Sequence, residues 1–386
     1  MVELTTLAAR DSYGRLLALL FAVTSDVAAA EDALADAFER AVRTWPERGT
    51  PGNPDGWLLT VARNRLRDRW RSADLRRVVP LEESRDAPAH LDELDVDAIP
   101  DRRLELMLVC AHPAIDPAVH TPLMLNTVLG FTAGQIGRAF STPGATMATR
   151  LVRAKRRIKA AGIPFRLPDR GDLPGRMTAV LEAVYGAYAI DATGEALHLA
   201  GVLTELAPDE PEAHGLAALM QLSAARAEAR TDGDGRFVPL GEQDPARWDR
   251  ELIERAHRHL RRAHACGRLG RFQLEAAIQA VHCVRPANWR SLLALHEVLD
   301  SVAPSLGASV AHAVVVAEVE GAAAGLARLD ALAGDRFQPA RAARAHLLER
   351  LGRVGEAVTA YRMAIELTSD PAERDYLKER LVRLDG

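Results

Sequence analysis

The segment from Phe131 to Lys159, "FTAGQIGRAFSTPGATMATRLVRAKRRIK", constrains the fold more than any other stretch of the chain. Thr132 and Gln135 have the spacing of a capping box, which predicts the start of a short helix. Turn-forming residues then end that helix, and Thr142 followed by Pro143 predicts the N-cap and first turn of the next one. The segment therefore predicts two helices joined by a tight turn, a helix-turn-helix.

A one-sided charge distribution marks the second of these helices. The segment holds seven basic residues and no acidic one, although the whole chain has a net charge of −4. At about 100° per residue, one stripe is apolar and the opposite face carries small residues followed by arginines. The apolar stripe comprises Met147, Leu151, Ala154 and Ile158. The opposite face comprises Ala145, Thr149, Val152, Arg153 and Arg156, with Arg150 and Arg157 on its flanks.

Such a face has the chemistry of a DNA-reading helix. Small side chains at the start of a helix permit close approach to base edges, and arginines bind phosphate groups or guanine. The alternative is a core helix with a solvated basic face, which needs no ligand. The capped short helix, the tight turn and the one-sided arginines occur together, and this combination favours DNA binding.

Two further amphipathic helices are predicted near the N-terminus, within residues 27–45 and 56–71. The first has the apolar residues Val27, Ala30, Leu34, Phe38, Ala41 and Trp45 opposite the polar residues Asp32, Asp36, Glu39, Arg40 and Arg43. The second has the apolar residues Leu58, Leu59, Ala62, Leu66 and Trp70 opposite the polar residues Asn64, Arg67, Asp68 and Arg71. Ordinary helices with solvated polar faces would give the same periodicity.

Composition narrows the class of protein. Ala, Leu, Arg and Glu dominate while aromatic residues make up only 5% of the chain, so we predict an all-α fold. No apolar run reaches the roughly 20 residues needed to span a bilayer, and the N-terminus lacks the pattern of a secretion signal. The cysteines Cys110, Cys266 and Cys283 are far apart and lack CxxC spacing, which indicates buried, reduced thiols of a cytoplasmic protein.

No motif indicates an enzyme, a cofactor or a metal site. The chain has no GxxxxGK followed by Ser or Thr, no GxGxxG after a strand and no HExxH. His257, His259 and His264 are close in sequence but do not share one helix face, so surface histidines are a better interpretation than metal ligands.

Four segments differ in composition. Residues 1–77 are helical in pattern and end in a basic run, and residues 78–100 form a strongly acidic, Pro-containing stretch that we interpret as a mobile linker. Residues 101–166 contain the helix-turn-helix. Residues 167–386 begin with a Pro- and Gly-rich stretch and continue as an Ala- and Leu-rich helical region.

Paired helices are predicted in the C-terminal half. "ARAARAHLLERLGRVGEAVTAYRMAIEL" has a tetratricopeptide-like pattern of small residues and a Leu-Gly pair, at Ala343, Leu347, Leu351, Gly352, Ala357, Tyr361 and Ala364. "VAEVEGAAAGLARLDAL" is a weaker version that aligns Gly321 with Gly352, and "LTELAPDEPEAHGLAALM" adds another helix boundary. The spacing is imperfect, so we predict a helical-repeat-like solenoid and not a regular array.

A polar loop interrupts these helices. It comprises Asp232, Gly233, Asp234, Gly235 and Arg236, which are turn-forming residues apart from the arginine. The loop lacks the spaced oxygen ligands and terminal Glu of a calcium-binding loop. From the residues alone, a plain solvent loop and a functional loop both remain open.

Taken in order, these segments resemble a known family. "AEDALADAFERAVRTW", "PDGWLLTVARNRLRDRWR" and "RLVRAKRRIKAAGIPFR" are similar to both domains of an extracytoplasmic-function sigma factor of bacterial RNA polymerase, over residues 1–166. The loop at residues 232–236 and the following "FQLEAAIQAVH" resemble the subgroup that has a C-terminal tetratricopeptide-like extension with a DGxR-type signature. One departure is that "AVYGAYAIDATGEALHL" lacks the Phe-Asn-Glu-Gly-Tyr-type stretch of that subgroup, which puts any function of that motif in doubt.

The resemblance implies partners and positions. It implies binding to core RNA polymerase, through the β′ clamp and the β flap, and to promoter DNA. Clamp binding is carried over to Asp32, Asp36, Glu39, Arg40 and Arg43, and reading of the −10 element to Asn64, Arg67, Asp68 and Arg71. Reading of the −35 element is carried over to Ala145, Thr149, Arg150, Arg153, Arg156 and Arg157.

The resemblance also implies that the extension controls activity in place of a membrane anti-sigma factor. We expect Arg236 either to pair with carboxylates of the acidic linker, such as Glu82, Glu83, Asp92 or Glu93, or to contact a regulatory protein.

Two other interpretations remain open from sequence. One is a homodimeric one-component regulator that reads DNA with its helix-turn-helix and senses a ligand or protein with its C-terminal half. The other is a tetratricopeptide-type adaptor. The N-terminal pair of amphipathic helices discriminates between them and the sigma factor, because a simple regulator does not need that pair.

Overall fold

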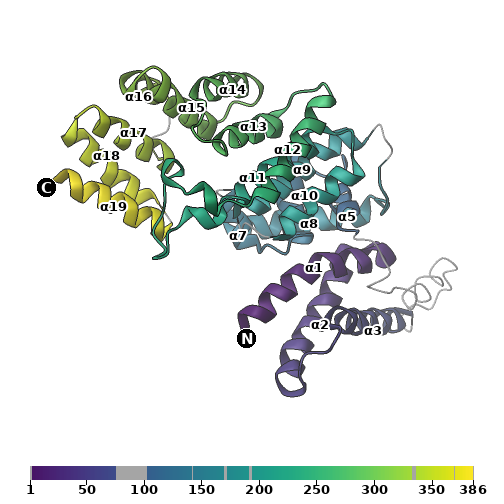
Figure 1. Cartoon of the computed structure of the whole chain (residues 1–386). Helices are drawn as coiled ribbons and strands as arrows, with labels where there is room; N and C mark the ends of the chain where they lie inside the picture. Colours follow the sequence, from purple (N-terminus) through teal and green to yellow (C-terminus); the bar gives the residue numbers. More distant parts are fainter. Residues whose placement is uncertain are drawn as a thin grey trace. The chain divides into compact units, whose positions relative to one another are not determined.

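The computed structural model describes residues 2–74, 102–140, 142–168, 172–190, 194–332, 336–368 and 370–385. The chain divides into two compact units, Met1–Leu199 and Ala200–Gly386. Within the described residues the fold is helical, as Figure 1 shows, and the one extended pairing is an isolated antiparallel bridge between Thr231 and Phe237. The predicted all-α class is therefore confirmed. The acidic linker of residues 78–100 lies outside the described residues.

The helices of the first unit come from both predicted sigma-like segments and from the region that follows them. They are α1 (Val2–Thr24), α2 (Val27–Arg48), α3 (Pro54–Asp74), α5 (Arg103–Cys110), α6 (Pro117–Thr127), α7 (Ala133–Ala139), α8 (Gly144–Ala160) and α9 (Leu173–Ile190). The helix α10 (Gly194–Leu206) spans the boundary between the units. Because α9 packs against α5 and α6, the first unit extends beyond the domain boundary expected at residue 167.

Local sequence signals explain where these helices begin. Asp26 is the N-cap of α2 and accepts a hydrogen bond from the backbone N–H of Ala29 at 3.2 Å. Asp116 caps α6 in the same way, and Pro117 occupies its first turn. The packing between α1 and the end of α6 is tight, because a Cβ on Gly14 would lie 1.9 Å from the carbonyl oxygen of Val128.

The core of the first unit is made by the apolar stripes that the sequence shows. In α2, Val27, Ala30, Leu34 and Ala41 are buried, whereas Phe38 and Trp45 are half-buried. In α3, Leu58, Leu59, Ala62 and Leu66 are buried, whereas Trp70 is half-buried. Helix α2 continues through Pro46 to Arg48, three residues beyond the predicted end.

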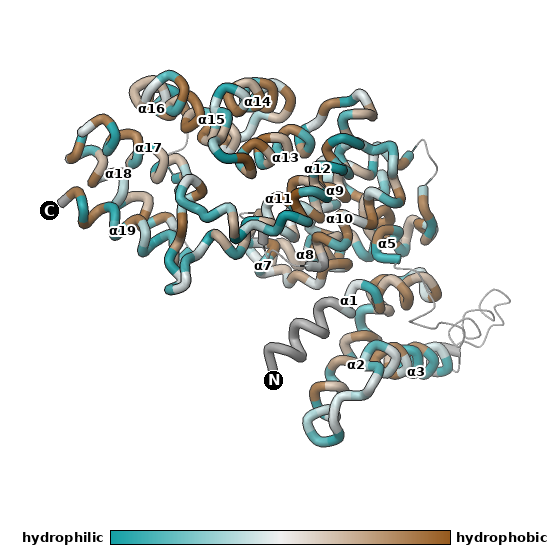
Figure 2. The backbone as a smooth tube through the Cα atoms, in the orientation of Figure 1, coloured by the Kyte–Doolittle hydropathy of each residue, from teal (hydrophilic) through white to brown (hydrophobic). Residues whose placement is uncertain are grey.

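The second unit is a succession of packed helices. They are α11 (Pro211–Ala224), α12 (Arg250–Ala265), α13 (Arg271–His282), α14 (Trp289–Val302), α15 (Leu306–Val319), α16 (Ala322–Asp330), α17 (Gln338–Arg350), α18 (Val354–Leu367) and α19 (Pro371–Asp385). Three short 3-10 helices, Ala227–Arg230, Leu240–Glu242 and Pro245–Arg247, lie between α11 and α12. Apolar residues on α13, α14 and α15 form one core cluster, and the same helices carry brown segments in Figure 2.

The helix boundaries predicted in this half are observed. Gly352 has φ +70° in the turn between α17 and α18, and Gly321 has φ +106° between α15 and α16. Both turns use a backbone conformation that glycine adopts without a steric penalty. Ala357, Tyr361 and Ala364 of α18 are buried in a core cluster with Leu347 of α17. Successive helical hairpins are thus present, whereas their tetratricopeptide identity remains a prediction.

The start of α13 is held by a residue from another helix. Glu212 in α11 accepts hydrogen bonds from the backbone N–H groups of Phe272 at 2.8 Å and Gln273 at 3.1 Å. These N–H groups have no partner inside α13, so the carboxylate supplies the missing cap. The helices approach closely at this point, because a Cβ on Gly215 would lie 2.5 Å from the backbone nitrogen of Gln273.

We expect Gly215→Ala to destabilise the second unit by about 1–3 kcal/mol, because added volume in a tight contact forces the backbone to move. The matched control is Gly201→Ala in α10, where a Cβ meets no atom within 4 Å. There alanine should stabilise the helix by up to about 1 kcal/mol. Urea unfolding of both variants measures the difference. Equal stabilities would contradict the close approach of α11 and α13.

Candidate nucleic-acid interface

Helices α7 and α8 form the expected helix-turn-helix. Thr132 Oγ1 accepts from the N–H of Gln135 at 3.3 Å, and Gln135 Oε1 accepts from the N–H of Thr132 at 2.9 Å, so the predicted capping box is present. The turn is tight, because a Cβ on Gly137 would lie 2.5 Å from the carbonyl oxygen of Thr142.

One detail of the turn differs from the prediction. The N-cap position of α8 is Pro143 and not Thr142, and the hydroxyl of Thr142 instead donates to the carbonyl oxygen of Phe140 at 3.1 Å. Proline has no side-chain oxygen to accept from the helix, so α8 begins without a side-chain cap. Among the described residues, no side chain at the N-cap position therefore accepts from the first backbone N–H groups of α8.

Helix α8 presents its predicted face to solvent. The apolar residues Met147, Leu151, Ala154 and Ile158 are buried. All six predicted reading positions are exposed, namely Ala145, Thr149, Arg150, Arg153, Arg156 and Arg157. Arg157 donates to the carbonyl oxygen of Ala114 at 3.2 Å, which fixes one edge of this face. Arg150, Arg153 and Arg156 make no side-chain hydrogen bond or ion pair within the described residues, so their guanidinium groups are available for a ligand.

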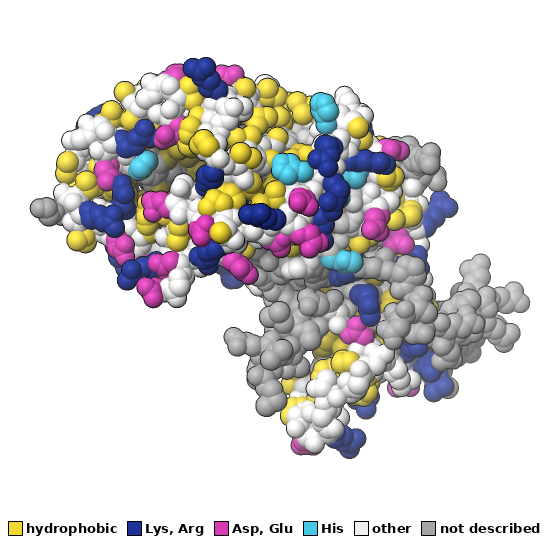
Figure 3. Space-filling model, in the orientation of Figure 1, with side chains coloured by type: hydrophobic (Ala, Val, Ile, Leu, Met, Phe, Trp, Pro, Cys, Tyr) yellow, Lys and Arg dark blue, Asp and Glu magenta, His cyan; other side chains and the backbone are white. Residues whose placement is uncertain are grey.

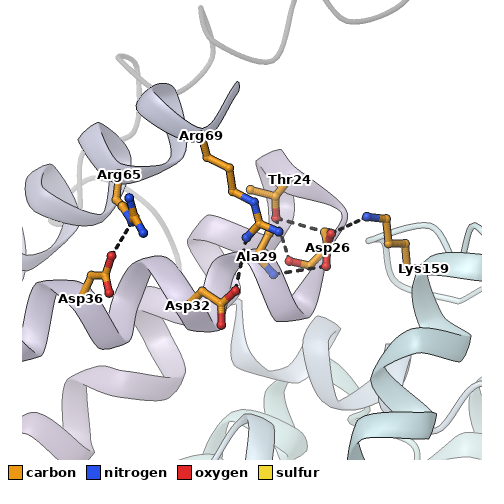
Figure 4. A network of polar contacts seen from close by, with 8 residues as sticks. All are labelled: Thr24, Asp26, Ala29, Asp32, Asp36, Arg65, Arg69 and Lys159. Atoms are coloured by element: carbon orange, nitrogen blue, oxygen red, sulfur yellow. Dashed lines mark hydrogen bonds and ion pairs between the residues drawn. The ribbon is translucent and has the colours of Figure 1, made fainter. Parts of the chain in front are cut away.

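The polar faces of α2 and α3 meet in two ion pairs. Arg69 lies 3.2 Å from Asp32, and Arg65 is paired with Asp36, as Figure 4 shows. The two acids are four residues apart on α2 and the two arginines are four residues apart on α3, so the pairs form successive rungs between the helices. The sequence predicted a role for both acids but not for Arg65 or Arg69. Their matching spacing was the signal that could have found them.

Other members of the predicted polymerase-binding and −10-reading sets stay accessible. On α2, Glu39, Arg40 and Arg43 are exposed, and Arg43 pairs with Glu39 at 2.5 Å. On α3, the remaining set comprises the exposed Asn64, Asp68 and Arg71 and the half-buried Arg67. Trp57 packs edge-on against Trp45 with ring centroids 5.6 Å apart, and both residues are half-buried.

A largely buried ion pair joins α8 to α2. The ammonium of Lys155 is 2.5 Å from Glu31 Oε1 and 2.7 Å from Asn126 Oδ1. The exposed fraction of the Lys155 side chain is 12% and that of Glu31 is 20%. Burial raises the pKa of Glu31, and attraction to Lys155 offsets this rise only in part. Removing either partner would therefore leave the other charge largely buried and without its counter-charge.

Three more contacts lie at or near this junction. Lys159 donates to Asp26 Oδ2 at 2.6 Å, as Figure 4 shows. Burial opposes ionisation of Asp26, but the hydrogen bond from Lys159 lowers the pKa of that carboxyl overall. Phe165 packs edge-on against Phe21 with centroids 5.3 Å apart, and the guanidinium of Arg102 lies 4.3 Å from the Phe165 ring centroid. The sequence did not predict these contacts, because they join residues that lie far apart in the chain.

The loop at residues 232–236 is an ordered turn. Asp232 Oδ1 accepts from the N–H groups of Asp234 and Arg236, both at 2.9 Å, and Gly235 has φ +78°. A side-chain oxygen of Asp that accepts from the backbone N–H two residues later is typical of an Asx turn. Arg236 is exposed, whereas its expected partners in the acidic linker lie outside the described residues.

The cysteines and the possible metal ligands of the chain can be described briefly. Cys110 is buried, and burial raises the pKa of its thiol to about 12, whereas Cys266 and Cys283 are half-buried and not fully buried as predicted. Among the described residues no cluster of three His, Cys, Asp or Glu side chains has the geometry to hold a metal ion. None of the helices in the described part of the chain is both long and apolar enough to cross a membrane.

Comparison with known proteins identifies the family that the N-terminal residues match. Residues 9–76, which include α2 and α3, match the family described as Sigma-70 region 2. This match supports a sigma factor of the sigma-70 family, with a role in transcription initiation and binding to core RNA polymerase. Residues 176–264 match a family of unknown function, DUF6596.

A full-length relative is also found. An uncharacterized protein of Rhizobium meliloti (strain 1021) is 36% identical over 380 residues, which cover 92% of this chain and 90% of the relative. The chain belongs to the same family as that protein. No solved structure matches the chain significantly.

Proposed function

We propose that the chain is an extracytoplasmic-function sigma factor that directs core RNA polymerase to its promoters and is regulated by its C-terminal extension. The match of residues 9–76 to sigma-70 region 2 is the observation that carries this proposal. It favours a sigma factor over a one-component regulator, because such a regulator needs no polymerase-binding helices. The exposed basic face of α8 supplies the second DNA contact that a sigma factor requires.

In this proposal the two faces of the first unit have separate tasks. The polar face of α2 binds the β′ clamp, through the exposed Glu39, Arg40 and Arg43 together with Asp32 and Asp36. The exposed part of α3, centred on Asn64, reads the −10 element, since a side-chain amide can hydrogen-bond a base edge. The arginines of α8 read the −35 element, and the surroundings of α8 contact the β flap.

The junction between α2 and α8 must open when both elements are read. Elements named for positions −10 and −35 are about 25 base pairs apart, or about 85 Å at about 3.4 Å per base pair. Helices that touch through Lys155 and Glu31 cannot span that distance. We therefore assign the contact between α2 and α8 to the free chain, before it engages a promoter. On the polymerase, the two helices are separated.

We expect the free chain to bind duplex promoter DNA poorly at physiological salt but to bind core polymerase tightly. Its net charge of −4 is unfavourable for DNA, and its arginine faces are small. Fluorescence anisotropy with promoter DNA, and gel filtration with core polymerase, measure the two affinities. Sub-micromolar promoter binding without polymerase would favour the one-component regulator.

The extension is the second part of the proposal. Its helical hairpins and the exposed loop at residues 232–236 offer a surface for a regulatory protein or for another part of the chain. Turn geometry that holds Arg236 at the base of an ordered, exposed loop supports a binding role for that side chain, because loops on a rigid scaffold commonly carry function.

Two variants test the extension. We expect that deleting residues 194–386, and separately Arg236→Ala, will change polymerase binding or promoter-specific transcription. The deletion begins between α9 and α10, because removing α9 would uncover α5 and α6. Arg290→Ala, another exposed arginine of the unit, is the control for Arg236→Ala. If both test variants match the full chain in both assays, the extension is an adaptor with its own partner and does not control sigma activity.

A further inference from the structure

Helix α12 carries a dense group of exposed arginines. Arg255, Arg258, Arg261 and Arg262 are all exposed, and at about 100° per residue they fall within an arc of about 120°. Figure 3 shows Lys and Arg side chains (dark blue) and histidines (cyan) gathered where Figure 1 places α12. The exposed part of α12 after Arg255 contains no acidic residue.

These arginines differ from others in the second unit. Arg328 pairs with Asp300, Arg350 with Glu318 and Arg380 with Glu349. By contrast, Arg258, Arg261 and Arg262 make no side-chain hydrogen bond or ion pair to any residue that the structure describes. Arg255 has only a distant contact, 4.0 Å from Glu251. The acidic residues of α12, Glu251 and Glu254, lie before this group, so Arg258, Arg261 and Arg262 form a positive face that an external anion can neutralise.

The apolar face of α12 is already in use. Ala256 and Ala263 are buried where α12 packs against α11. His259 joins this packed face through a contact of 3.1 Å between its Nδ1 and Nδ1 of His214. Burial lowers the pKa of His259 to about 4, so the ring is neutral near pH 7 and contributes to packing and not to charge. The helix therefore has no free apolar face with which to enter a bilayer.

The chemistry of the exposed face fits a phosphate backbone better than a protein. Protein interfaces have an apolar or aromatic centre, and no large apolar side chain lies among these arginines. Guanidinium groups suit phosphate oxygens, because they donate in a planar fork and keep their charge. Arg255 and Arg262 are seven residues apart, or about 10 Å along the helix, which is close to the roughly 12 Å width of the DNA major groove.

We propose that the arginine face of α12 binds the phosphate backbone of duplex DNA, without reading its sequence. The extension then adds a DNA contact to those of α3 and α8. This inference rests on the proposed function only in taking DNA as the relevant polyanion. The contact is weak at physiological salt, in keeping with the poor promoter binding that we expect of the free chain, and strengthens once polymerase holds DNA nearby.

The test uses the full chain carrying Arg258→Ala, Arg261→Ala and Arg262→Ala together. Alanine favours helix at exposed sites, so α12 should remain folded, and a second triple variant with glutamine guards against an effect of alanine itself. The control removes three charges elsewhere in the unit, by Arg290→Ala, Arg362→Ala and Arg383→Ala, which are exposed on α14, α18 and α19. Binding to random-sequence duplex DNA is measured from about 50 mM to about 200 mM salt, without polymerase.

We expect the slope of log affinity against log salt to fall by about 3 in both α12 variants, about 1 for each lost phosphate contact, and equally for every DNA sequence. The control should keep most of the wild-type slope. Slopes in the α12 variants that equal the control would overturn the proposal. The proposal would also fail if the α12 substitutions weakened binding to vesicles of anionic lipid or to poly-glutamate but left DNA binding unchanged. Because polymerase is absent, failure of the sigma-factor assignment would not alter this readout.

Discussion

Arg153→Ala and Arg156→Ala should each lower transcription from promoters that depend on the −35 element by about tenfold to a hundredfold. An arginine that reads a base contributes about 1–3 kcal/mol, and about 1.4 kcal/mol corresponds to a factor of ten. Both side chains are exposed on α8, and neither has a side-chain partner within the described residues, so the substitutions remove a ligand contact without disturbing the fold. Run-off transcription with reconstituted holoenzyme provides the measurement.

The pattern across promoters distinguishes base reading from phosphate binding. If an arginine reads a base, its loss should affect promoters that carry that base and relax specificity at one position. If it contacts phosphate, its loss should weaken all promoters alike and flatten the salt dependence by about 1. Arg290→Ala is the control, because it removes an exposed arginine from α14, outside the predicted reading face. Unchanged transcription in both test variants would contradict the assignment of this helix face.

Lys155→Ala should destabilise the first unit by about 3 kcal/mol. Removing one partner of a buried ion pair leaves a charge with neither water nor counter-ion, and such losses cost about 3–5 kcal/mol when burial is complete. The pair is not fully buried, which places the expected cost near the lower limit. Lys159→Ala is the control, since that side chain is 66% exposed and a surface ion pair contributes at most about 1 kcal/mol.

A second substitution identifies the cause. Combining Lys155→Ala with Glu31→Gln removes the uncompensated carboxylate and should recover part of the lost stability. The pH dependence has a definite sign. A raised folded-state pKa of Glu31 means that the folded unit binds this proton more tightly than the unfolded chain, so this group's contribution to stability falls as pH rises above the unfolded value. Lys155→Ala should therefore lose most stability near neutral pH. Equal stability losses for Lys155→Ala and Lys159→Ala would contradict the buried pair.

Features set by neighbouring residues could be predicted from sequence. The capping box at Thr132 and Gln135, the apolar stripe of α8 and the turn at Gly352 each depend on residues within one or two helical turns. The start of α8 could not be placed to one residue, because Thr142 and Pro143 are both acceptable before a helix and the hydroxyl of Thr142 bonds backward to Phe140.

Contacts between distant segments could not be predicted in the same way. Lys155 lies beside the basic face of α8 on a helical wheel, and nothing near it in sequence indicates Glu31 as a partner. The same applies to α9, whose apolar pattern does not reveal that it packs against α5 and α6. The group of arginines on α12 was visible in sequence, but only the burial of Ala256 and Ala263 shows which side of the helix remains open.

The central claim is tested most directly by transcription with core polymerase and this chain as the only source of sigma activity. On a library of promoter fragments we predict initiation at defined start sites, with a recurring pair of sequence elements about 25 base pairs apart. In the Arg153→Ala and Arg156→Ala variants, initiation should no longer depend on the upstream element, whereas its dependence on the downstream element should remain. A chain that forms no complex with core polymerase, or that leaves initiation unselective while binding promoter DNA tightly by itself, would contradict the account.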